Sequence, residues 1–197
     1  DVSSRLFNNH LVGKIYPIIL AAQGRTFILS TSIKSMNEIK SLLKDKFEKN
    51  NINYPILTQG ESSKIKLLEQ FKYHGNAILI GSLSFWEGVD VRGKELSLVI
   101  IDKLPFQSPG DPIFESKINL LSAQGINAFM TFQLPKAIIS LKQGAGRLIR
   151  DEEDKGVLMI CDSRIISKPY GRSFWQSLPS FKRTRNQEDV IDFLNHL

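Results

Sequence analysis

The chain has 197 residues, enough for one substantial domain, and 42% of them are hydrophobic, which is ample for a core. Its net charge of +6 favours an anionic partner, with nucleic acid or a nucleotide first and a membrane surface second. No apolar run approaches the ~18 residues that cross a bilayer, and no segment resembles a secretory signal. A single cysteine, Cys161, excludes an internal disulfide and a cysteine-based metal site. These features predict a cytoplasmic protein, and the start at Asp1 suggests a piece of a longer chain.

Apolar runs typical of buried strands alternate with helical patterns along the chain. They lie at residues 26–30, 54–58, 77–81, 97–102 and 157–162. Because they are almost continuously hydrophobic, we expect strands that are covered on both faces, as in a parallel sheet. The sequence therefore predicts a doubly wound α/β domain, whose ligands bind beyond the carboxyl ends of its strands.

The helical patterns carry recognisable caps and inner faces. Helices are predicted at residues 11–22, after a cap at Thr31-Ser32, at residues 61–71, and at residues 187–197 after a cap at Asn186. In the helix over residues 61–71, the apolar spacing predicts that Ile65, Leu68 and Phe71 face inward.

Residues 103–131 interrupt the alternation of strands and helices. Three prolines and a glycine near the start of this segment predict a stiff, non-helical excursion. Short helices are expected at residues 118–121 and 128–132, on either side of a break at Gly125. We predict that residues 103–131 form a helical and proline-rich insertion, or a cap over the sheet, rather than a second domain.

A basic, glycine-bearing stretch runs from Gln143 to Arg150. Read as a helix, its spacing places Gln143, Arg147 and Arg150 on one face. Gly144 and Gly146 weaken a helix, which indicates the close approach of a ligand or of backbone. Two guanidiniums beside bare backbone suit a polyphosphate whose charge shifts during a reaction. A solvated basic helix end fits the same pattern equally well.

A polar and aromatic loop follows the third predicted strand. Ser82 and Ser84 carry hydroxyls that suit the phosphates of a nucleic acid, and Asp90 suits a ribose hydroxyl. Trp86 and Phe85 have rings that could stack on a base. Packing in the core is the alternative for both rings, and it is favoured for Phe85.

Other polar residues follow the first and fourth predicted strands. Thr31 and Ser32 suit a phosphate contact or a simple helix cap, and Lys103 lies on the loop after the fourth strand. The basic segment at residues 182–185 fits a solvated surface better than a specific site. The three histidines lie far apart, so no metal site is predicted among them.

The sequence contains no G-x-x-x-x-G-K-[ST] phosphate loop and no evident acid pair for Mg²⁺. A domain with arginines for a γ-phosphate and no cradle for it requires a partner domain. We expect the nucleotide to lie in the cleft between the two domains.

Several longer motifs together resemble a known family. They read S-F-W-E-G-V-D at residues 84–90, L-S-L-V-I-I-D-K-L-P-F at residues 96–106, Q-G-x-G-R-L-I-R-D at residues 143–151, V-L-x-I-C-D-x-R at residues 157–164 and K/R-P-Y-G at residues 168–171. In combination they resemble the second motor domain of superfamily 2 helicases of the XPD/DinG group, with the bacterial YoaA branch most similar. The resemblance covers roughly residues 11–185.

The resemblance implies a RecA-like domain of an ATP-dependent helicase that moves 5′ to 3′ on single-stranded DNA. Arg147 and Arg150 would be arginine fingers that reach the γ-phosphate of ATP, and Gln143 would help to sense the nucleotide. By position in the family motifs, Gly88 and Asp90 lie nearer the nucleotide, and Thr31, Ser32, Ser82, Ser84 and Trp86 lie nearer the DNA. We add Glu87 to the nucleotide side and Lys103, from the predicted rim, to the DNA side.

The resemblance also implies what lies outside this sequence. The family's phosphate loop, its Mg²⁺-binding acids and its four-cysteine iron–sulfur cluster belong to the first motor domain, so we expect this chain to be inactive alone. The implied partners are single-stranded DNA, the N-terminal motor domain and, for the YoaA branch, a chi-like subunit of the replication clamp loader. A non-catalytic module that docks nucleic acid or protein, and a second domain of an RNA helicase, are the alternatives.

Overall fold

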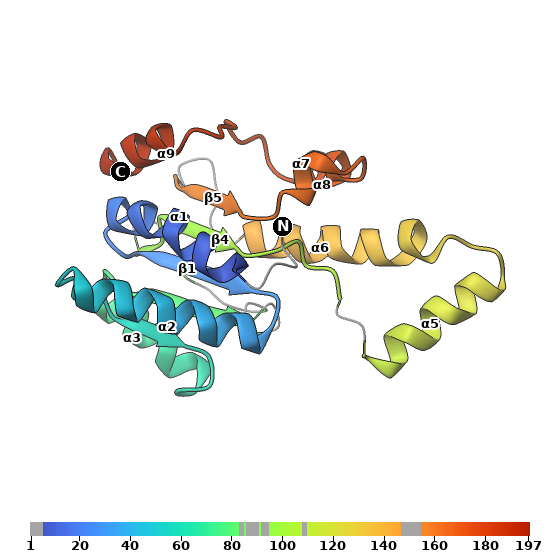
Figure 1. Ribbon diagram of the computed structural model, residues 1–197, viewed down its shortest axis with the longest axis horizontal. Helices are drawn as coiled ribbons and strands as arrows, with labels where there is room; N and C mark the ends of the chain where they lie inside the picture. Colours follow the sequence, from blue (N-terminus) through green and yellow to red (C-terminus); the bar gives the residue numbers. More distant parts are fainter. Residues whose placement is uncertain (1–5, 83–84, 86–90, 92–94, 108–109, 147–154) are drawn as a thin grey trace.

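The predicted parallel sheet is present in a computed structural model, which describes residues 6–82, 85, 91, 95–107, 110–146 and 155–197 (Figure 1). Its strands are β1 (Thr26–Ser30), β2 (Ile56–Thr58), β3 (Ile78–Ser82), β4 (Leu98–Ile101) and β5 (Val157–Ile160). They pair in the order β2-β3-β1-β4-β5, and every pair is parallel. The five apolar runs are thus confirmed as strands.

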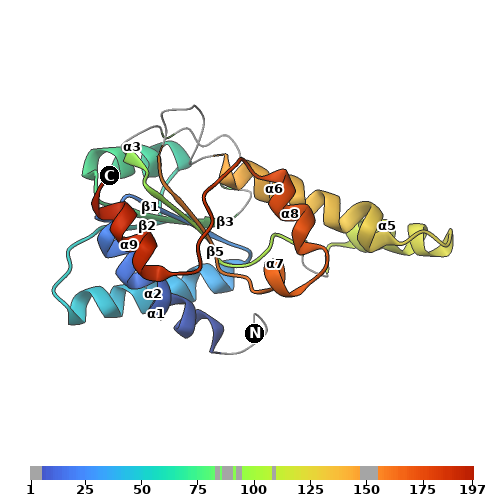
Figure 2. The ribbon, with the colours of Figure 1, turned by 90° about the horizontal axis from the view of Figure 1, so that it is seen from above.

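Helices cover both faces of this sheet. They are α1 (Phe7–Ala21), α2 (Ile33–Lys49), α3 (Lys64–His74), α5 (Pro112–Ala123), the π-helical turn η2 (Phe129–Gln133), α6 (Leu134–Ala145), α7 (Arg164–Ser167), α8 (Gly171–Ser177) and α9 (Gln187–Asn195). Alternate side chains of the strands point to opposite faces. The Ile28 side chain belongs to a buried cluster with residues of α1, α2 and α9, whereas those of Phe27 and Leu29 belong to a cluster with residues of α3, α6 and α8. Figure 2 shows the arrangement of these helices around the sheet. The doubly wound architecture is therefore confirmed.

Local caps explain where several helices begin. The Ser32 hydroxyl accepts a hydrogen bond from the backbone N–H of Ser35 at 3.1 Å and begins α2. The Asn186 side chain accepts one from the N–H of Glu188 at 3.0 Å and begins α9. Both predicted caps are confirmed.

The predicted inner face of α3 is partly wrong. Ile65 is 71% exposed, whereas Leu67 and Phe71 are each 1% exposed. Residues two apart on a helix lie about 200° around its axis, so Ile65 and Leu67 cannot share a face. The buried stripe of α3 is narrow, and Leu68 lies at its border.

The segment after β4 contains longer helices than the sequence predicts. The expected helix at residues 118–121 is α5, which begins at Pro112 because Asp111 accepts hydrogen bonds from the N–H groups of Ile113 and Phe114. Gly125 ends it with φ of +71°, and η2 then continues into α6. In Figure 1, α5 lies to one side of the sheet. The description of residues 103–131 as an insertion stays a prediction.

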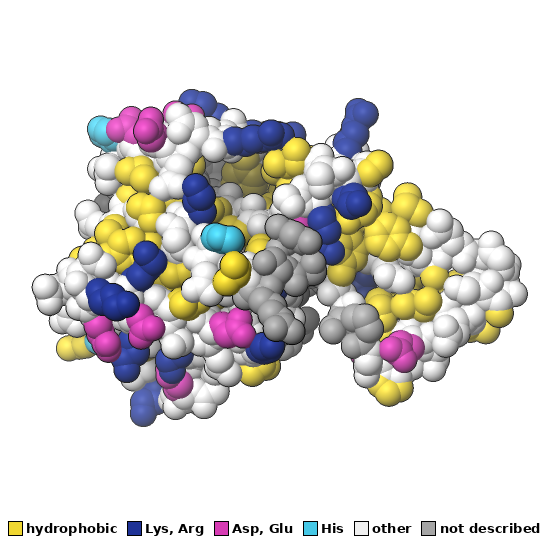
Figure 3. All heavy atoms as spheres, viewed as in Figure 1, with side chains coloured by type: hydrophobic (Ala, Val, Ile, Leu, Met, Phe, Trp, Pro, Cys, Tyr) yellow, Lys and Arg dark blue, Asp and Glu magenta, His cyan; other side chains and the backbone are white. Residues whose placement is uncertain are grey.

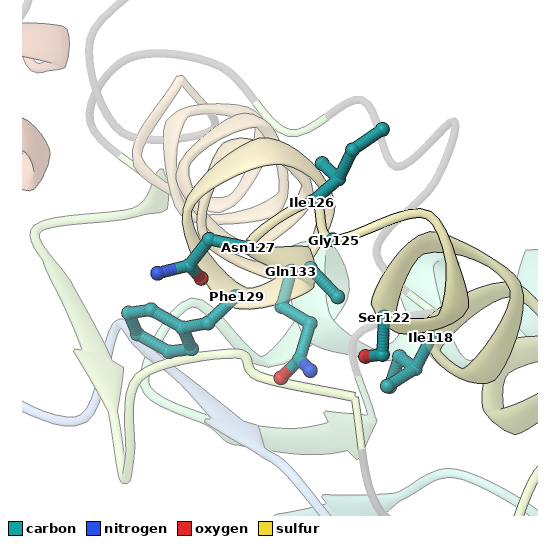
Figure 4. Close-up of a pocket in the computed structure, with 8 residues that line it drawn as sticks. Ile118, Ser122, Gly125, Ile126, Asn127, Phe129 and Gln133 are labelled. Carbon is teal, nitrogen blue, oxygen red and sulfur yellow. The ribbon is translucent and has the colours of Figure 1, made fainter.

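A shallow pocket lies between α5 and η2, and Figure 4 shows the residues that line it. Its polar lining residues are Ser122, Asn127 and Gln133, and it has no charged side chain. It therefore offers no cation to a nucleotide or a nucleic acid. Within the described ranges, no helix combines the length and the apolar character needed to cross a bilayer.

Candidate functional site

The carboxyl ends of β1 and β4 form the crevice where this fold binds ligands. These strands are neighbours, but the chain leaves β1 toward α2 on one face of the sheet and returns from β4 through α6 on the other. Such a switch of faces between adjacent strands opens a crevice beyond their carboxyl ends. We call the residues directly after β1, β3 and β4, together with the last turn of α6, the carboxyl edge.

Three of the predicted DNA-side residues meet at this edge. Thr31 and Ser32 follow β1 directly, and Lys103 follows β4 by one residue. The backbone N–H of Thr31 donates a hydrogen bond to Asp102 Oδ1 at 3.0 Å, which ties the two loops together. Thr31 is half-buried and Ser32 is exposed. The cap that the sequence left as an alternative for Ser32 is present, and its exposed position leaves it accessible at the edge as well.

Lys103 is held by an aromatic ring of α1. Its Nζ lies 4.8 Å from the centre of the Phe7 ring, and the side chain is half-buried. A cation over a ring is stabilised by the ring quadrupole. This contact fixes a positive charge at the carboxyl edge.

Ser82 lies next to the crevice on the other side of β1. It ends β3 in register with Ser30, and its backbone N–H donates to Gln59 Oε1 at 2.7 Å. Gln59 follows β2, so this bond joins two further loops of the same rim. The predicted common rim of these strand ends is therefore present for the described residues.

The last turn of α6 packs over the ends of β1 and β4. A Cβ built on Gly144 would lie 3.7 Å from side-chain atoms of Leu29 and of Ile101. These are ordinary contacts with side chains. The prediction that a closely approaching backbone requires a glycine at position 144 is therefore wrong. The exposed Gln143 precedes it on the outer side. The helix end thus points back to the carboxyl edge, as its predicted role requires.

Several predicted site residues fall outside the described part of the chain. They are Ser84, Trp86, Glu87, Gly88, Asp90, Arg147 and Arg150. Phe85 is described and is 8% exposed, so it belongs to the core, as favoured. A Cβ on Gly81 would lie 2.8 Å from Phe85 Cδ1, which shows how tightly this ring packs on β3.

Two buried acids of this region escaped the sequence reasoning. Asp102 and Asp162 follow β4 and β5 and are 0% and 1% exposed. The signal that could have found them is an acid that closes an apolar strand, because a buried carboxyl group needs specific hydrogen-bond partners.

Asp162 is a buried carboxylate with a charged partner. It accepts hydrogen bonds from the N–H of Leu104 at 2.8 Å and from the Arg164 guanidinium at 2.6 Å. Burial acts to raise its pKa, but the bonds from Arg164 and from backbone N–H groups outweigh it, and the pKa lies below its ordinary value. Asp162 thereby anchors the loop after β4 from the neighbouring strand.

Among the described residues, no charged side chain is bonded to Asp102, and the pKa of Asp102 shifts in the opposite direction. Its carboxyl group contacts the hydroxyl of Ser35 at 2.9 Å and the backbone N–H of Thr31. Burial raises the pKa of Asp102 above its ordinary value, and the hydrogen bonds and the charge of Lys103 oppose this effect only in part. Among the described residues, no group of three or more His, Cys, Asp or Glu side chains could hold a metal ion.

Comparison with known proteins assigns the family. The model of the helicase C-terminal domain matches residues 15–181. The chain is 50% identical over 184 residues to the ATP-dependent DNA helicase YoaA of Escherichia coli (strain K12), covering 93% of this chain and 28% of that protein. It is 38% identical over 184 residues to the ATP-dependent helicase DinG of Mycobacterium tuberculosis (strain ATCC 25618 / H37Rv), covering 93% and 27%. The chain thus spans less than a third of the length of these relatives.

A solved structure supports the fold. An XPD helicase superimposes with a TM-score of 0.64 and 23% sequence identity, over 93% of this chain and 33% of that one. The parallel sheet and this similarity confirm the RecA-like α/β fold. With the family model covering most of its length, the chain belongs to the helicase C-terminal domain family.

Proposed function

We propose that this chain is the second motor domain of an ATP-dependent DNA helicase that moves 5′ to 3′ on single-stranded DNA. The observation that carries the proposal is the course of α6, whose last turn packs on Leu29 and Ile101 at the carboxyl edge. Along the sequence, Arg147 and Arg150 come two and five residues after the end of α6, and Thr31, Ser32 and Lys103 lie at the same carboxyl edge as its last turn. Nucleotide-directed and DNA-directed side chains would then share one crevice.

In this proposal the chain completes a site that a preceding motor domain begins. Arg147 and Arg150 stabilise the charge that develops on the γ-phosphate, and Gln143 senses the nucleotide. Glu87, Gly88 and Asp90 face the nucleotide, and Ser82, Ser84 and Trp86 contact the DNA with the residues named above. Mg²⁺ would neutralise phosphate charge when bound, and the described residues hold no acid cluster that fits it. We therefore assign its ligands to the preceding domain.

The remaining parts of the proposal concern the whole protein. Closure of the two domains on ATP, and their opening after hydrolysis, would step the DNA strand. An iron–sulfur cluster in the preceding half, a chi-like clamp-loader subunit as partner and a cytoplasmic location are proposed with it. The cluster and the subunit follow from the family resemblance of the sequence motifs, and the location follows from the composition with its single cysteine.

The chain alone is expected to bind single-stranded DNA and to leave ATP intact. Anisotropy of a labelled oligo(dT) measures binding, and phosphate release with and without the oligonucleotide measures turnover. Lys103→Ala should weaken binding about threefold at low salt, since one phosphate contact is lost. The matched control is Lys49→Ala, an exposed lysine at the far end of α2.

DNA-stimulated turnover by the 197 residues would contradict the division of the site between two domains. Equal losses for Lys103→Ala and Lys49→Ala would contradict the DNA-side assignment. Tighter binding of an RNA oligonucleotide than of DNA would favour the RNA-helicase alternative.

Gly144→Ala tests whether a ligand, rather than the fold, requires a glycine at this position. Alanine adds only ordinary contacts and favours the helix, so the free energy of unfolding should rise by about 0.5–1 kcal/mol in urea titrations. If the glycine serves the nucleotide, the same change in the full-length protein should reduce ATP turnover. A stabilised variant with unchanged turnover would mean that no ligand requires this glycine.

A fixed basic surface supports a second candidate function, a docking module. Arg183 stacks over the Trp175 ring at 4.9 Å, and Trp175 Nε1 donates to the carbonyl of Ile165 at 3.1 Å. Lysine and arginine side chains line the upper edge in Figure 3, over the region of α7, α8 and the chain that leads to α9. The segment at residues 182–185 is therefore held in place, and it presents positive charge to a partner.

Charge neutralisation tests this candidate better than truncation, because deletion of residues 180–197 would remove the buried Leu194 from the core. Lys182→Gln with Arg185→Gln leaves the stacked Arg183 in place. A pull-down with a purified chi-like subunit, compared with oligo(dT) binding, identifies the partner. Unchanged capture of both would exclude this surface.

A further inference from the structure

A chain of polar side chains runs inward from the surface to the residue that follows β4. It joins Glu38 of α2 through Asn8 of α1 and Ser35 of α2 to Asp102. Asn8 Nδ2 lies 2.5 Å from Glu38 Oε2, and Ser35 Oγ lies 3.1 Å from Asn8 Oδ1 and 2.9 Å from Asp102 Oδ2. Asn8, Ser35 and Asp102 are 8%, 4% and 0% exposed, so water does not replace these bonds.

The donors and acceptors in this chain balance only if Asp102 carries a proton. Glu38 is exposed and accepts from the Asn8 amide, so Asn8 turns its NH₂ to Glu38 and its carbonyl oxygen to Ser35. The Ser35 hydroxyl has one hydrogen, and the Asn8 carbonyl needs it. Asp102 Oδ2 must then donate to Ser35 Oγ, because two bare acceptors 2.9 Å apart would repel each other.

The surroundings of Asp102 agree with a neutral carboxyl group. Its other oxygen accepts from the N–H of Thr31 at 3.0 Å, which a neutral carboxyl still does. Among the residues that the structure describes, the titratable groups that interact with it are the adjacent Lys103 and the thiol of Cys161, which follows β5 and whose own pKa is raised by burial and by the nearby acids. Glu38 lies two hydrogen bonds beyond Ser35. Burial raises the pKa of Asp102, in the direction that the hydrogen-bond count requires.

We propose that Asp102 is a positioning residue, a protonated acid that holds the Thr31–Ser32 loop by accepting from Thr31 and donating to Ser35. The consequence for DNA binding rests on the proposed function, because it takes Thr31 and Ser32 as DNA contacts. The protonated state rests on the hydrogen-bond geometry alone. The two parts are tested separately.

Asp102→Asn is the matched substitution. An amide offers one acceptor and one donor at the positions where a neutral carboxyl offers them, so all bonds of the chain can persist. At pH 4 the Tm should stay within about 2 °C of the wild type, at pH 7 it should not lie below the wild type, and oligo(dT) affinity should stay within about twofold. Asp162→Asn makes the same chemical change at an ionised acid on the next strand, and its Tm should fall clearly.

Asp102→Leu keeps the branched shape of the side chain in a somewhat larger volume and removes both hydrogen bonds. Its affinity for oligo(dT) should fall about fivefold, since Thr31 loses the bond that holds its loop, while circular dichroism retains the folded spectrum. Should this variant not fold, Ser35→Ala takes its place, because it breaks the chain of hydrogen bonds at its centre. Asp102→Asn is the comparison for either variant, since it keeps the bonds that hold the loop.

The proton itself has a direct readout. The ¹³Cγ resonance of Asp102 in labelled chain should keep its neutral-carboxyl shift at pH 7. Because the folded-state pKa is raised above 3.8, the folded state binds more protons, and wild-type stability falls as pH rises from about 4 through that pKa. Asp102→Asn lacks this loss, so its stability relative to the wild type should increase over the same window.

Each part of the inference has its own contradicting result. An Asp102 resonance that titrates near 3.8, or an Asp102→Asn that loses as much Tm as Asp162→Asn, overturns the protonated acid. An Asp102→Leu variant with lower Tm and unchanged affinity overturns the positioning role. A wild-type chain that binds no oligonucleotide overturns the proposed function and the DNA part with it, whereas the resonance still decides the proton.

Discussion

Replacing Arg150 with alanine in the full-length protein is expected to reduce DNA-stimulated ATP turnover by a factor on the order of 10³–10⁵, the contribution of arginine fingers in other nucleotide hydrolases. The guanidinium would act on charge that develops only in the transition state, so kcat falls while the affinity for single-stranded DNA stays nearly unchanged. Steady-state phosphate release and oligonucleotide anisotropy on the same preparation measure both. Arg150→Lys should recover little, since an ammonium cannot bind a phosphate through two parallel N–H groups.

Lys142→Ala is the control for this prediction. Lys142 is an exposed cation of α6, close in sequence to the basic stretch and outside the proposed nucleotide-facing residues. Its loss changes the net charge of the chain by one unit, as Arg150→Ala does, without removing a proposed finger. Turnover near the wild-type value in Arg150→Ala, or equal losses in both variants, would contradict the arginine-finger assignment.

Asp162→Asn is expected to lower the free energy of unfolding of the chain by about 3 kcal/mol at pH 7. The carboxylate accepts from the Leu104 N–H and the Arg164 guanidinium at Oδ2, and from the backbone N–H and Nε of Arg164 at Oδ1. An amide has only one acceptor oxygen, so its NH₂ group would face donors at one of these positions, and Arg164 would remain partly buried without a negative partner. The lower end of the usual range for a broken buried ion pair applies, because the Arg164 side chain is 31% exposed and partly solvated. Urea denaturation followed by circular dichroism measures the loss.

The pH dependence of this loss of stability follows from the lowered pKa of Asp162. The folded-state pKa of Asp162 lies below the ordinary value of 3.8, so its contribution is fully present above that pH. It is lost as the pH falls through the folded-state pKa, and the curves of wild type and variant should converge there. Asp189→Asn is a control at an exposed acid, which bonds to Thr184, and should change stability by less than about 1 kcal/mol. A difference between wild type and Asp162→Asn that is small and constant with pH would contradict an ionised, paired Asp162.

Much of the fold could be predicted because its signals are local. Apolar runs of strand length, helix caps such as Ser32 and Asn186, and the alternation of the two predict a parallel sheet without knowledge of distant contacts. A parallel sheet in turn brings the residues after its strands to one edge, which is why Thr31, Ser82 and Lys103 could be grouped from sequence.

The wrong predictions concern residues whose burial or neighbours depend on how a helix packs on the sheet. Ile65 and Leu67 are both apolar, and only the packing of α3 on the sheet decides that Leu67 is buried and Ile65 exposed. Likewise, Gly144 looked like a site of close backbone approach, and its actual neighbours leave room for a Cβ. Neither outcome can be read from spacing along the chain.

The sequence by itself determined the strands, the family, and the grouping at one edge of the sheet of the residues that follow its parallel strands, since each depends on short patterns. Only the tertiary structure decided the chemistry of the two buried acids. Asp102 and Asp162 have the same sequence signature, an acid that closes an apolar strand. The fold brings Arg164 to one and the uncharged Ser35 to the other, so one carboxyl group has its pKa lowered and the other has it raised. A pKa depends on burial and on partners that lie far away in the sequence, and these exist only once the chain has folded.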